Sequence, residues 1–139
     1  MLILDTDHMT EIERGSLGGQ ALRVRLERGA APFGTTIISV EELLRGRLAQ
    51  IARCRDPERL VLHYARFQDR VAVLARWLTL KWDVSAAAKF EQLAVQRLGL
   101  GTMDLRIASI ALTQNATLLS RNLRDFQRIP NLNVEDWLE

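Results

Sequence analysis

Short apolar runs alternate with helical segments along this chain, and that alternation limits the possible folds more than any other feature. Apolar or β-branched runs lie at residues 2–4, 35–40 and 116–120, with a last short run at 132–136. Runs of this length, separated by helical patterns, are typical of a parallel sheet with helices packed on its faces. The sequence therefore predicts an α/β sandwich around a mostly parallel sheet.

The segments between these runs show helical spacing and helix end signals. Ser39 and Glu42 stand in capping-box spacing, and Asp56 with Pro57 marks the start of a further helix. Thr102 is the predicted N-cap of a later one. The predicted helices lie at 6–14, within 16–34, and at 39–54, 57–80, 85–99 and 102–115; a brief edge strand is predicted at 80–84 and a polar turn or short helix at 121–126.

The chain has the length and composition of one soluble domain. It contains 139 residues, of which 47% are hydrophobic and 26% charged, and we expect a single domain over residues 1–139. No stretch approaches the roughly 18 apolar residues of a membrane span, and the N-terminus does not have the pattern of a signal peptide. The single cysteine, Cys54, cannot form an internal disulfide. We expect a cytoplasmic protein that has no membrane partner.

Arginine supplies almost all of the positive charge. Of 19 basic residues only Lys81 and Lys89 are lysine, so 17 are arginine, and the formal net charge is +2. Guanidinium groups bind phosphates and carboxylates through paired hydrogen bonds. A GC-rich genome favours arginine codons as well, so this bias permits nucleic-acid binding without requiring it.

Acidic and amide side chains directly follow three of the predicted strands. Asp5 comes after the first apolar run, Glu41 and Glu42 after the second, and Asn122 and Asp125 after the third. Ligands of parallel α/β sheets bind beyond the carboxyl ends of the strands. We expect these side chains to gather at one edge of the sheet.

Asp104 lies on a helix face that is otherwise apolar. In the helix predicted over 102–115 it is spaced i, i+3, i+4 and i+7 with Ile107, Ala108 and Ala111. A carboxylate in the first helical turn is also stabilised by free N–H groups and by the helix dipole. The apolar neighbours favour a functional role over this structural one.

The other acids have structural alternatives too. Asp5 is suited to capping the helix predicted over 6–14, and Asp7 to a first-turn interaction with its dipole. Glu42 is placed to close a capping box with Ser39, and Glu41 remains a rival to Glu42 as a functional residue.

Together, several acids near one pole of a small domain, with no lysine close in sequence, predict a bound cation. Hard divalent ions such as Mg²⁺ or Mn²⁺ take carboxylate oxygens as ligands. Zinc is disfavoured, because His8, His63 and Cys54 provide no pair of ligands at zinc-site spacing.

Four segments, in this order, resemble the VapC-type toxins of the PIN-domain family. They are "LILDTD" at the start, "ISVEELLRG", "LGLGTMDLRIASIA" with its Gly-x-x-Asp-x-x-Ile-Ala pattern, and "ATLLSRNLRDFQRIPNLNVEDW" at the end. The resemblance covers nearly the whole chain. It implies a PIN-like three-layer α/β/α sandwich with a twisted, mostly parallel sheet.

The resemblance also implies a site. Asp5, Glu42 and Asp104 would be the metal-binding and catalytic acids, and the resemblance selects Glu42 over Glu41. The fourth catalytic position, often aspartate in the family, falls on Asn122, which offers a neutral oxygen but no charge.

The activity implied is Mg²⁺- or Mn²⁺-dependent cleavage of single-stranded RNA, with a cognate antitoxin as protein partner. Ser120 would orient a neighbouring acid. Arginines close in sequence to the acids are candidates for holding RNA phosphates; they are Arg45, Arg47, Arg106 and Arg121.

A homodimer is expected as well. The helices at about 40–54 and 57–79 carry more apolar side chains than a small sheet needs. Those of the second helix and the residues that follow are Leu60, Tyr64, Phe67, Val71, Leu74 and Trp77.

Two other functions fit parts of the sequence. A PIN-like RNA-binding module with weak or no catalysis is one, because Asn122 replaces an acid. The other is an aspartyl-phosphate phosphatase, since Asp5-Thr6-Asp7 resembles the Asp-x-Asp motif of haloacid-dehalogenase-type enzymes. Met9 stands where that motif prefers Thr or Val, so the phosphatase is the less favoured of the two.

Overall fold

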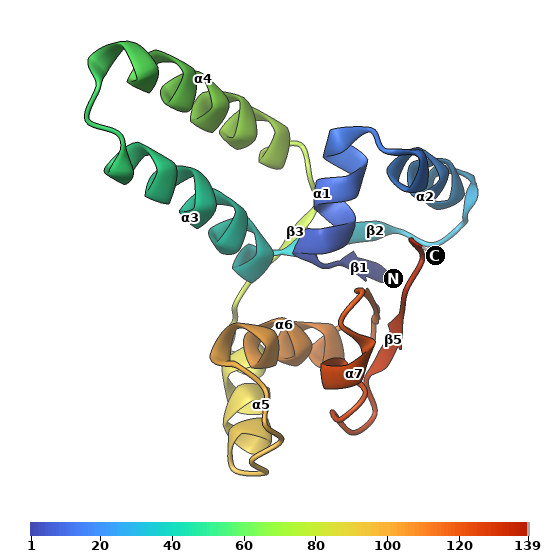
Figure 1. Cartoon of the computed structure of the whole chain (residues 1–139). Helices are drawn as coiled ribbons and strands as arrows, with labels where there is room; N and C mark the ends of the chain where they lie inside the picture. The colour runs from blue at the N-terminus through green and yellow to red at the C-terminus, as the bar shows by residue number, and fades with distance from the viewer. Residues whose placement is uncertain (139) are drawn as a thin grey trace.

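The computed structural model describes residues 1–138, and within them five strands form one parallel sheet (Figure 1). The strand order is β3-β2-β1-β4-β5, and every neighbouring pair is parallel. The predicted α/β class is confirmed. The strands are β1 (Leu2–Leu4), β2 (Phe33–Thr36), β3 (Thr79–Leu80), β4 (Thr117–Leu119) and β5 (Asn133–Glu135).

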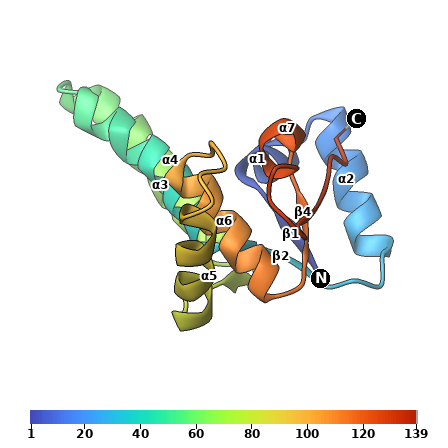
Figure 2. The same cartoon turned by 90° about the horizontal axis from the view of Figure 1, so that it is seen from below.

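Helices connect the strands and cover both faces of the sheet (Figure 2). None of the helices within residues 1–138 is long and apolar enough to cross a membrane. They are α1 (Thr6–Arg14), α2 (Leu17–Arg28), α3 (Ile37–Arg53), α4 (Pro57–Leu74), α5 (Val84–Ala94), α6 (Thr102–Thr113) and α7 (Leu123–Phe126).

Alternating strand side chains divide the core into two halves. Ile3 and Leu118 belong to the half that α5 and α6 cover, whereas Leu4 and Leu119 belong to the half with α1, α2 and the end of α4. All four side chains are fully buried. Successive side chains of a strand point to opposite faces, so even these three-residue strands hold a helical layer on each side.

Two glycines allow backbones to approach closely. A Cβ at Gly19 of α2 would lie 2.0 Å from the carbonyl oxygen of Glu11 in α1, and one at Gly34 of β2 would lie 2.5 Å from that of Leu78. Neither distance is compatible with a side chain, so these positions require glycine.

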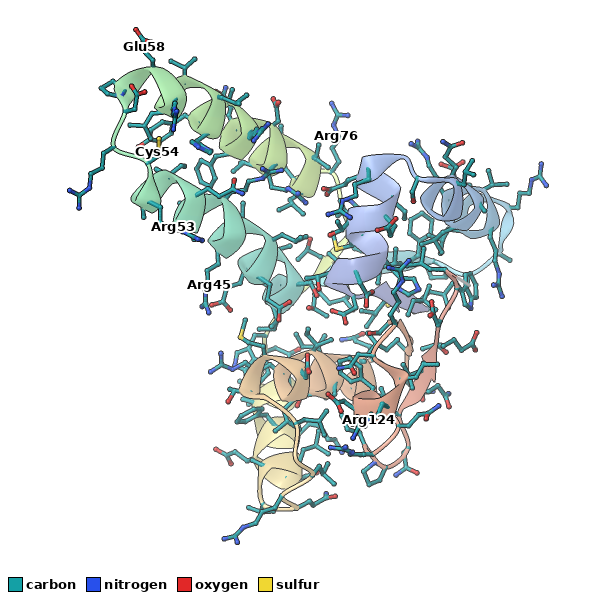
Figure 3. The ribbon with its side chains drawn as sticks, viewed as in Figure 1. Arg45, Arg53, Cys54, Glu58, Arg76 and Arg124 are labelled. Atoms are coloured by element: carbon teal, nitrogen blue, oxygen red, sulfur yellow. The ribbon has the colours of Figure 1, made fainter. Side chains whose placement is uncertain are left out.

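Helices α3 and α4 pack against each other and extend as an arm away from the sheet (Figures 1 and 2). Arg45 points from α3 away from α4, and Cys54 lies at the turn between the two helices (Figure 3). Several apolar side chains on the arm are exposed, among them Leu48, Val61, Leu62 and Tyr64.

The second strand is displaced from its predicted position. It ends at Thr36, and the β-branched residues that follow begin α3. Thr36 is the N-cap, because its hydroxyl accepts the N–H of Ser39 at 3.1 Å. The prediction of Ser39 as N-cap, with Glu42 closing a capping box, is therefore wrong. The helical conformation buries Ile38 in the core, which overrides its preference for a strand.

Two further boundaries differ from the predictions. Thr102 is not a cap, since Gly101 occupies the N-cap of α6 without a side-chain hydrogen bond. Helix α4 ends at Leu74 rather than near residue 80, because Leu78 accepts the N–H of Thr35 at 2.9 Å and draws the chain into edge strand β3.

Candidate active site

Asp5 lies at the carboxyl end of β1, and only 6% of it is exposed. One carboxylate oxygen accepts the N–H of Thr6 at 2.8 Å, which caps α1. The other accepts the hydroxyl of Ser120 at 2.8 Å. Asp5 thus caps a helix, as the structural alternative predicts, and also points an oxygen toward the end of the neighbouring strand.

Ser120 reaches Asp5 because of the sheet register. Leu4 of β1 pairs with Leu119 of β4, so the residues that follow the two strands lie side by side. The fully buried hydroxyl of Ser120 also accepts the N–H of Asn122 at 3.1 Å. The hydroxyl therefore joins Asp5 to the loop that carries Asn122.

Glu42 lies in the second turn of α3 and Asp104 in the first turn of α6, and these two helices contact each other. Both are partly buried. Burial is the largest cause of the raised pKa of Glu42, about 7, and the charges of Asp5 and Asp104 raise it further. The structure therefore brings these three sequence-predicted acids within electrostatic reach of one another.

The same repulsion acts on Asp5 and Asp104. Burial raises the pKa of Asp5 to about 6, with further increases from Asp7 and Asp104. Burial also raises the pKa of Asp104, together with the charges of Asp125 and Asp7. Across residues 1–138, no three acidic, histidine or cysteine side chains converge on one metal position in this arrangement.

Asp7 behaves differently from Asp5, two residues away. One of its oxygens accepts the backbone N–H of His8 at 2.6 Å and lies 2.7 Å from its Nδ1, and the other accepts the N–H of Arg121 at 2.9 Å. Burial alone would raise its pKa, but these hydrogen bonds lower it. Both oxygens of Asp7 are occupied by donors from the protein.

The two neighbouring glutamates, Glu41 and Glu42, have different interaction partners. Glu41 forms an ion pair with Arg45, one turn later in α3, and both side chains are exposed. Glu42 is instead coupled to the buried acids. Asn122 donates to Asp125 through its amide nitrogen at 3.2 Å, so its carbonyl oxygen is not used in this bond.

The candidate phosphate-binding arginines lie on different elements. Arg106 contacts the sulfur of Met103 on α6, and Arg121 is held through its backbone next to Ser120. Arg47 lines a cavity formed mainly by α1, α2 and α4. The roles of Arg45, Arg106 and Arg121 in binding substrate stay predictions.

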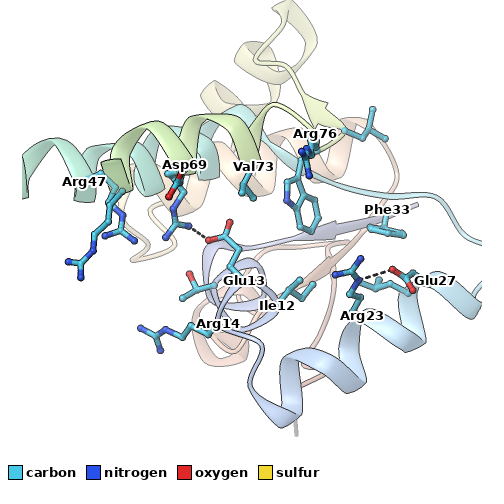
Figure 4. Close-up of a pocket in the computed structure, with 16 residues that line it drawn as sticks. Ile12, Glu13, Arg14, Arg23, Glu27, Phe33, Arg47, Asp69, Val73 and Arg76 are labelled. Atoms are coloured by element: carbon cyan, nitrogen blue, oxygen red, sulfur yellow. Dashed lines mark hydrogen bonds and ion pairs between the residues drawn. The ribbon is translucent and has the colours of Figure 1, made fainter. Parts of the chain in front are cut away.

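Sequence reasoning missed two features. One is that cavity, about 920 Å³, which is lined by six arginines and by apolar side chains such as Ile12 and Trp77. Figure 4 shows it in close-up. The other is the complete burial of His8, which lies beside the site. The Asp-Thr-Asp-His order at the start of the chain was the only local sign of it.

Comparisons with known proteins find similar sequences and structures, although no family model matches the chain. Ribonuclease VapC2 of Rickettsia felis is 53% identical over 38 residues, 27% of this chain and 28% of that protein. The tRNA(fMet)-specific endonuclease VapC of Salmonella typhimurium is 28% identical over 120 residues, 84% of this chain and 83% of that protein.

Solved structures cover almost the entire chain. DNA-bound VapBC from Salmonella typhimurium aligns with a TM-score of 0.72 at 26% identity, over 98% of this chain and 97% of that one. The chain is therefore similar to VapC-type proteins in sequence and in fold. VapBC-1 of nontypeable Haemophilus influenzae shares the VapC-type fold with a TM-score of 0.74 at 22% identity, over 99% of this chain and 98% of the other.

Proposed function

We propose that this chain is a metal-dependent endoribonuclease that cleaves single-stranded RNA as the toxin of a type II toxin–antitoxin pair. The observation that carries the proposal is the coupling of Asp5, Glu42 and Asp104 at one edge of the sheet. Among the described residues, the main contributions to their pKa values come from burial, other carboxylates, hydroxyl groups and a backbone N–H. The relatives named ribonuclease or endonuclease VapC support the same activity.

The donor set fits Mg²⁺ or Mn²⁺. Carboxylate oxygens are the ligands these ions prefer, and Asn122 adds a neutral oxygen. Asp5, Glu42 and Asp104 would hold the ion. When bound, such an ion supplies positive charge that stabilises the phosphate during in-line attack by water.

The surrounding residues have distinct tasks in this mechanism. Ser120 and the N–H of Thr6 fix the Asp5 carboxylate, so that it does not need to reorganise when substrate arrives. The guanidinium groups of Arg106 and Arg121 would bind phosphates flanking the cleaved bond.

Paired glutamate variants test the activity. The purified protein should cleave single-stranded RNA with Mn²⁺ or Mg²⁺, and EDTA should stop the reaction. Glu42→Gln should lower the rate by orders of magnitude, whereas Glu41→Gln, its neighbour paired with Arg45, should retain it. RNA binding without cleavage by the wild type would favour the non-catalytic module. A phosphorylated Asp5 would favour the phosphatase.

A cognate antitoxin is the proposed partner, and the arginine-lined cavity is its proposed docking site. The cavity combines apolar walls with six arginines and three acids, so it suits a segment that carries aliphatic and carboxylate side chains. These charged residues are Arg14, Arg23, Arg47, Arg66, Arg70, Arg76, Glu13, Glu27 and Asp69. The VapBC complexes among the structural relatives support such a partner.

Co-expression tests the partner. Expression of the chain alone should arrest growth, and the product of a small adjacent reading frame should relieve the arrest. Arg66→Glu should weaken the complex, whereas Arg55→Glu, at the tip of the arm, should leave it intact. Free growth without the neighbouring product would contradict the toxin role.

A homodimer is proposed from the exposed apolar side chains of the α3–α4 arm. Tyr64 and Val71 are 54% and 44% exposed, whereas Leu74, also expected at the interface, is buried in the core. Light scattering at micromolar concentration should give the mass of two chains. Val61→Asp should shift it toward one chain, and a monomeric wild type would refute the dimer.

A further inference from the structure

A chain of hydrogen bonds joins the C-terminal segment to the acidic edge of the sheet through His8. The imidazole is fully buried, and both of its nitrogens have partners. Nε2 accepts the backbone N–H of Trp137 at 3.1 Å, and Nδ1 lies 2.7 Å from a carboxylate oxygen of Asp7.

These partners determine which nitrogen carries the proton. A backbone N–H can only donate, so Nε2 is the unprotonated nitrogen, and Nδ1 donates to Asp7. Nε2 also lies 3.5 Å from Asp136, which follows β5. His8 therefore connects α1 to the segment after β5 in one defined orientation.

Asp7 carries this connection to the loop beside Asp5. Its second oxygen accepts the N–H of Arg121, the residue between Ser120 and Asn122. Ser120 in turn donates to Asp5 and accepts from Asn122. Displacement of Asp7 would thus release the loop that holds Asp5 and presents Asn122.

We propose that His8 is a positioning residue for cleavage: acting through Asp7, it fixes the Ser120–Asn122 loop against Asp5. The inference rests on the proposed ribonuclease function. It assigns Asp7 to the clamp rather than to the metal, since both of its oxygens already accept hydrogen bonds from His8 and Arg121.

A matched pair of variants separates positioning from simple stabilisation. The amide nitrogen of Asn stands as many bonds from the backbone as imidazole Nδ1, so His8→Asn keeps the donor to Asp7. The side-chain amide of Gln matches Nε2, so His8→Gln keeps the acceptor for Trp137 and loses the donor to Asp7. Both remove the ring and should lower Tm similarly.

The proposal predicts that the two variants differ in kcat. His8→Gln should lower kcat about tenfold to a hundredfold with little change in KM, because the loop geometry is lost while RNA contacts remain. His8→Asn should stay within a few-fold of wild type. Equal kcat values in the two variants would overturn the proposal.

Amide hydrogen exchange at Arg121 provides a readout that does not depend on activity. Exchange should accelerate in His8→Gln and in Asp7→Asn, and stay slow in wild type and His8→Asn. If the wild type does not cleave RNA, the proposed function fails. The exchange rates still show whether His8, through Asp7, holds the loop at Arg121. Unchanged exchange in both His8→Gln and Asp7→Asn would refute it.

Discussion

The carboxylates at the acidic edge of the sheet and those in the arginine-lined cavity have opposite electrostatic surroundings. At the edge, Asp5, Glu42 and Asp104 repel one another, and their pKa values are raised. In the cavity, Glu13 pairs with Arg70 and Glu27 pairs with Arg23 (Figure 4).

The difference cannot be due to a shortage of arginine, because the chain contains 17. In the cavity, arginines line the same walls as the acids and pair with them. At the acidic edge, no positive side chain is among the main causes of the pKa shifts of the three acids. One region is thus suited to a cation from outside, and the other, with its excess of guanidinium groups, to an anionic partner.

The largest effect is expected at Asp104. Asp104→Asn keeps the shape and removes the charge, so RNA cleavage should fall by orders of magnitude while Tm holds or rises, since repulsion is relieved. A residue that only interacts with the helix dipole would instead lose about 0.3–1 kcal/mol of stability and retain activity. Mn²⁺-dependent cleavage measured beside thermal melts distinguishes the two, and full activity would remove Asp104 from the site.

The pH dependence of stability should carry the signature of the acidic edge. The pKa values of Asp5 and Glu42 in the folded protein, about 6 and about 7, lie above their unfolded values. The folded state therefore binds more protons, and stability falls as pH rises from about 4 to about 7 and then levels off. For Asp5 alone the change is about 3 kcal/mol.

Binding of a divalent ion should remove much of this fall in stability with rising pH. Metal-free protein in EDTA should lose stability over the range, whereas Mn²⁺ should raise Tm most at the upper end, where the acids are ionised. Thermal melts from pH 4 to 8 under both conditions test this. If Mn²⁺ does not change the dependence of Tm on pH, the acids at this edge do not bind the ion.

A smaller effect is expected in the cavity. The side chains of Glu13 and Arg70 are only 17% and 14% exposed, so Arg70→Met leaves a mostly buried carboxylate unpaired. Stability should fall by about 1–3 kcal/mol with RNA cleavage unchanged. Arg23→Gln is the matched control, because its pair with Glu27 is exposed and screened by solvent, so its loss should change stability little. Equal losses would show that burial does not distinguish the two pairs.

The smallest effect is expected on α3, the helix between the two regions. A Cβ at Gly46 would meet no atom within 4 Å, so the position is open. Gly46→Ala should raise the free energy of unfolding by about 0.5–1 kcal/mol, because glycine is unfavourable within a helix. Chemical denaturation measures this, and a loss of stability would contradict the open surface.

The sequence by itself determined the strand–helix alternation and the placement of Asp5 and Asn122 after two of the predicted strands. These features depend on local periodicity and on the general rule that parallel strands end at a common edge. The site assignments of Glu42 and Asp104 came from the resemblance and from one acid on an apolar face, and the structure adds their electrostatic coupling.

Only the tertiary structure decided which distant groups contact each of two neighbouring acids. Asp5 and Asp7 look alike in the sequence, but Asp7 bonds to Arg121, 114 residues away, and His8 bonds to Trp137, 129 residues away. Likewise, burial of Ile38 moved the start of α3 and the cap from Ser39 to Thr36. Local patterns record which backbone conformation a segment prefers; they do not record which distant donors meet a given carboxylate, because packing of the whole chain brings those donors together.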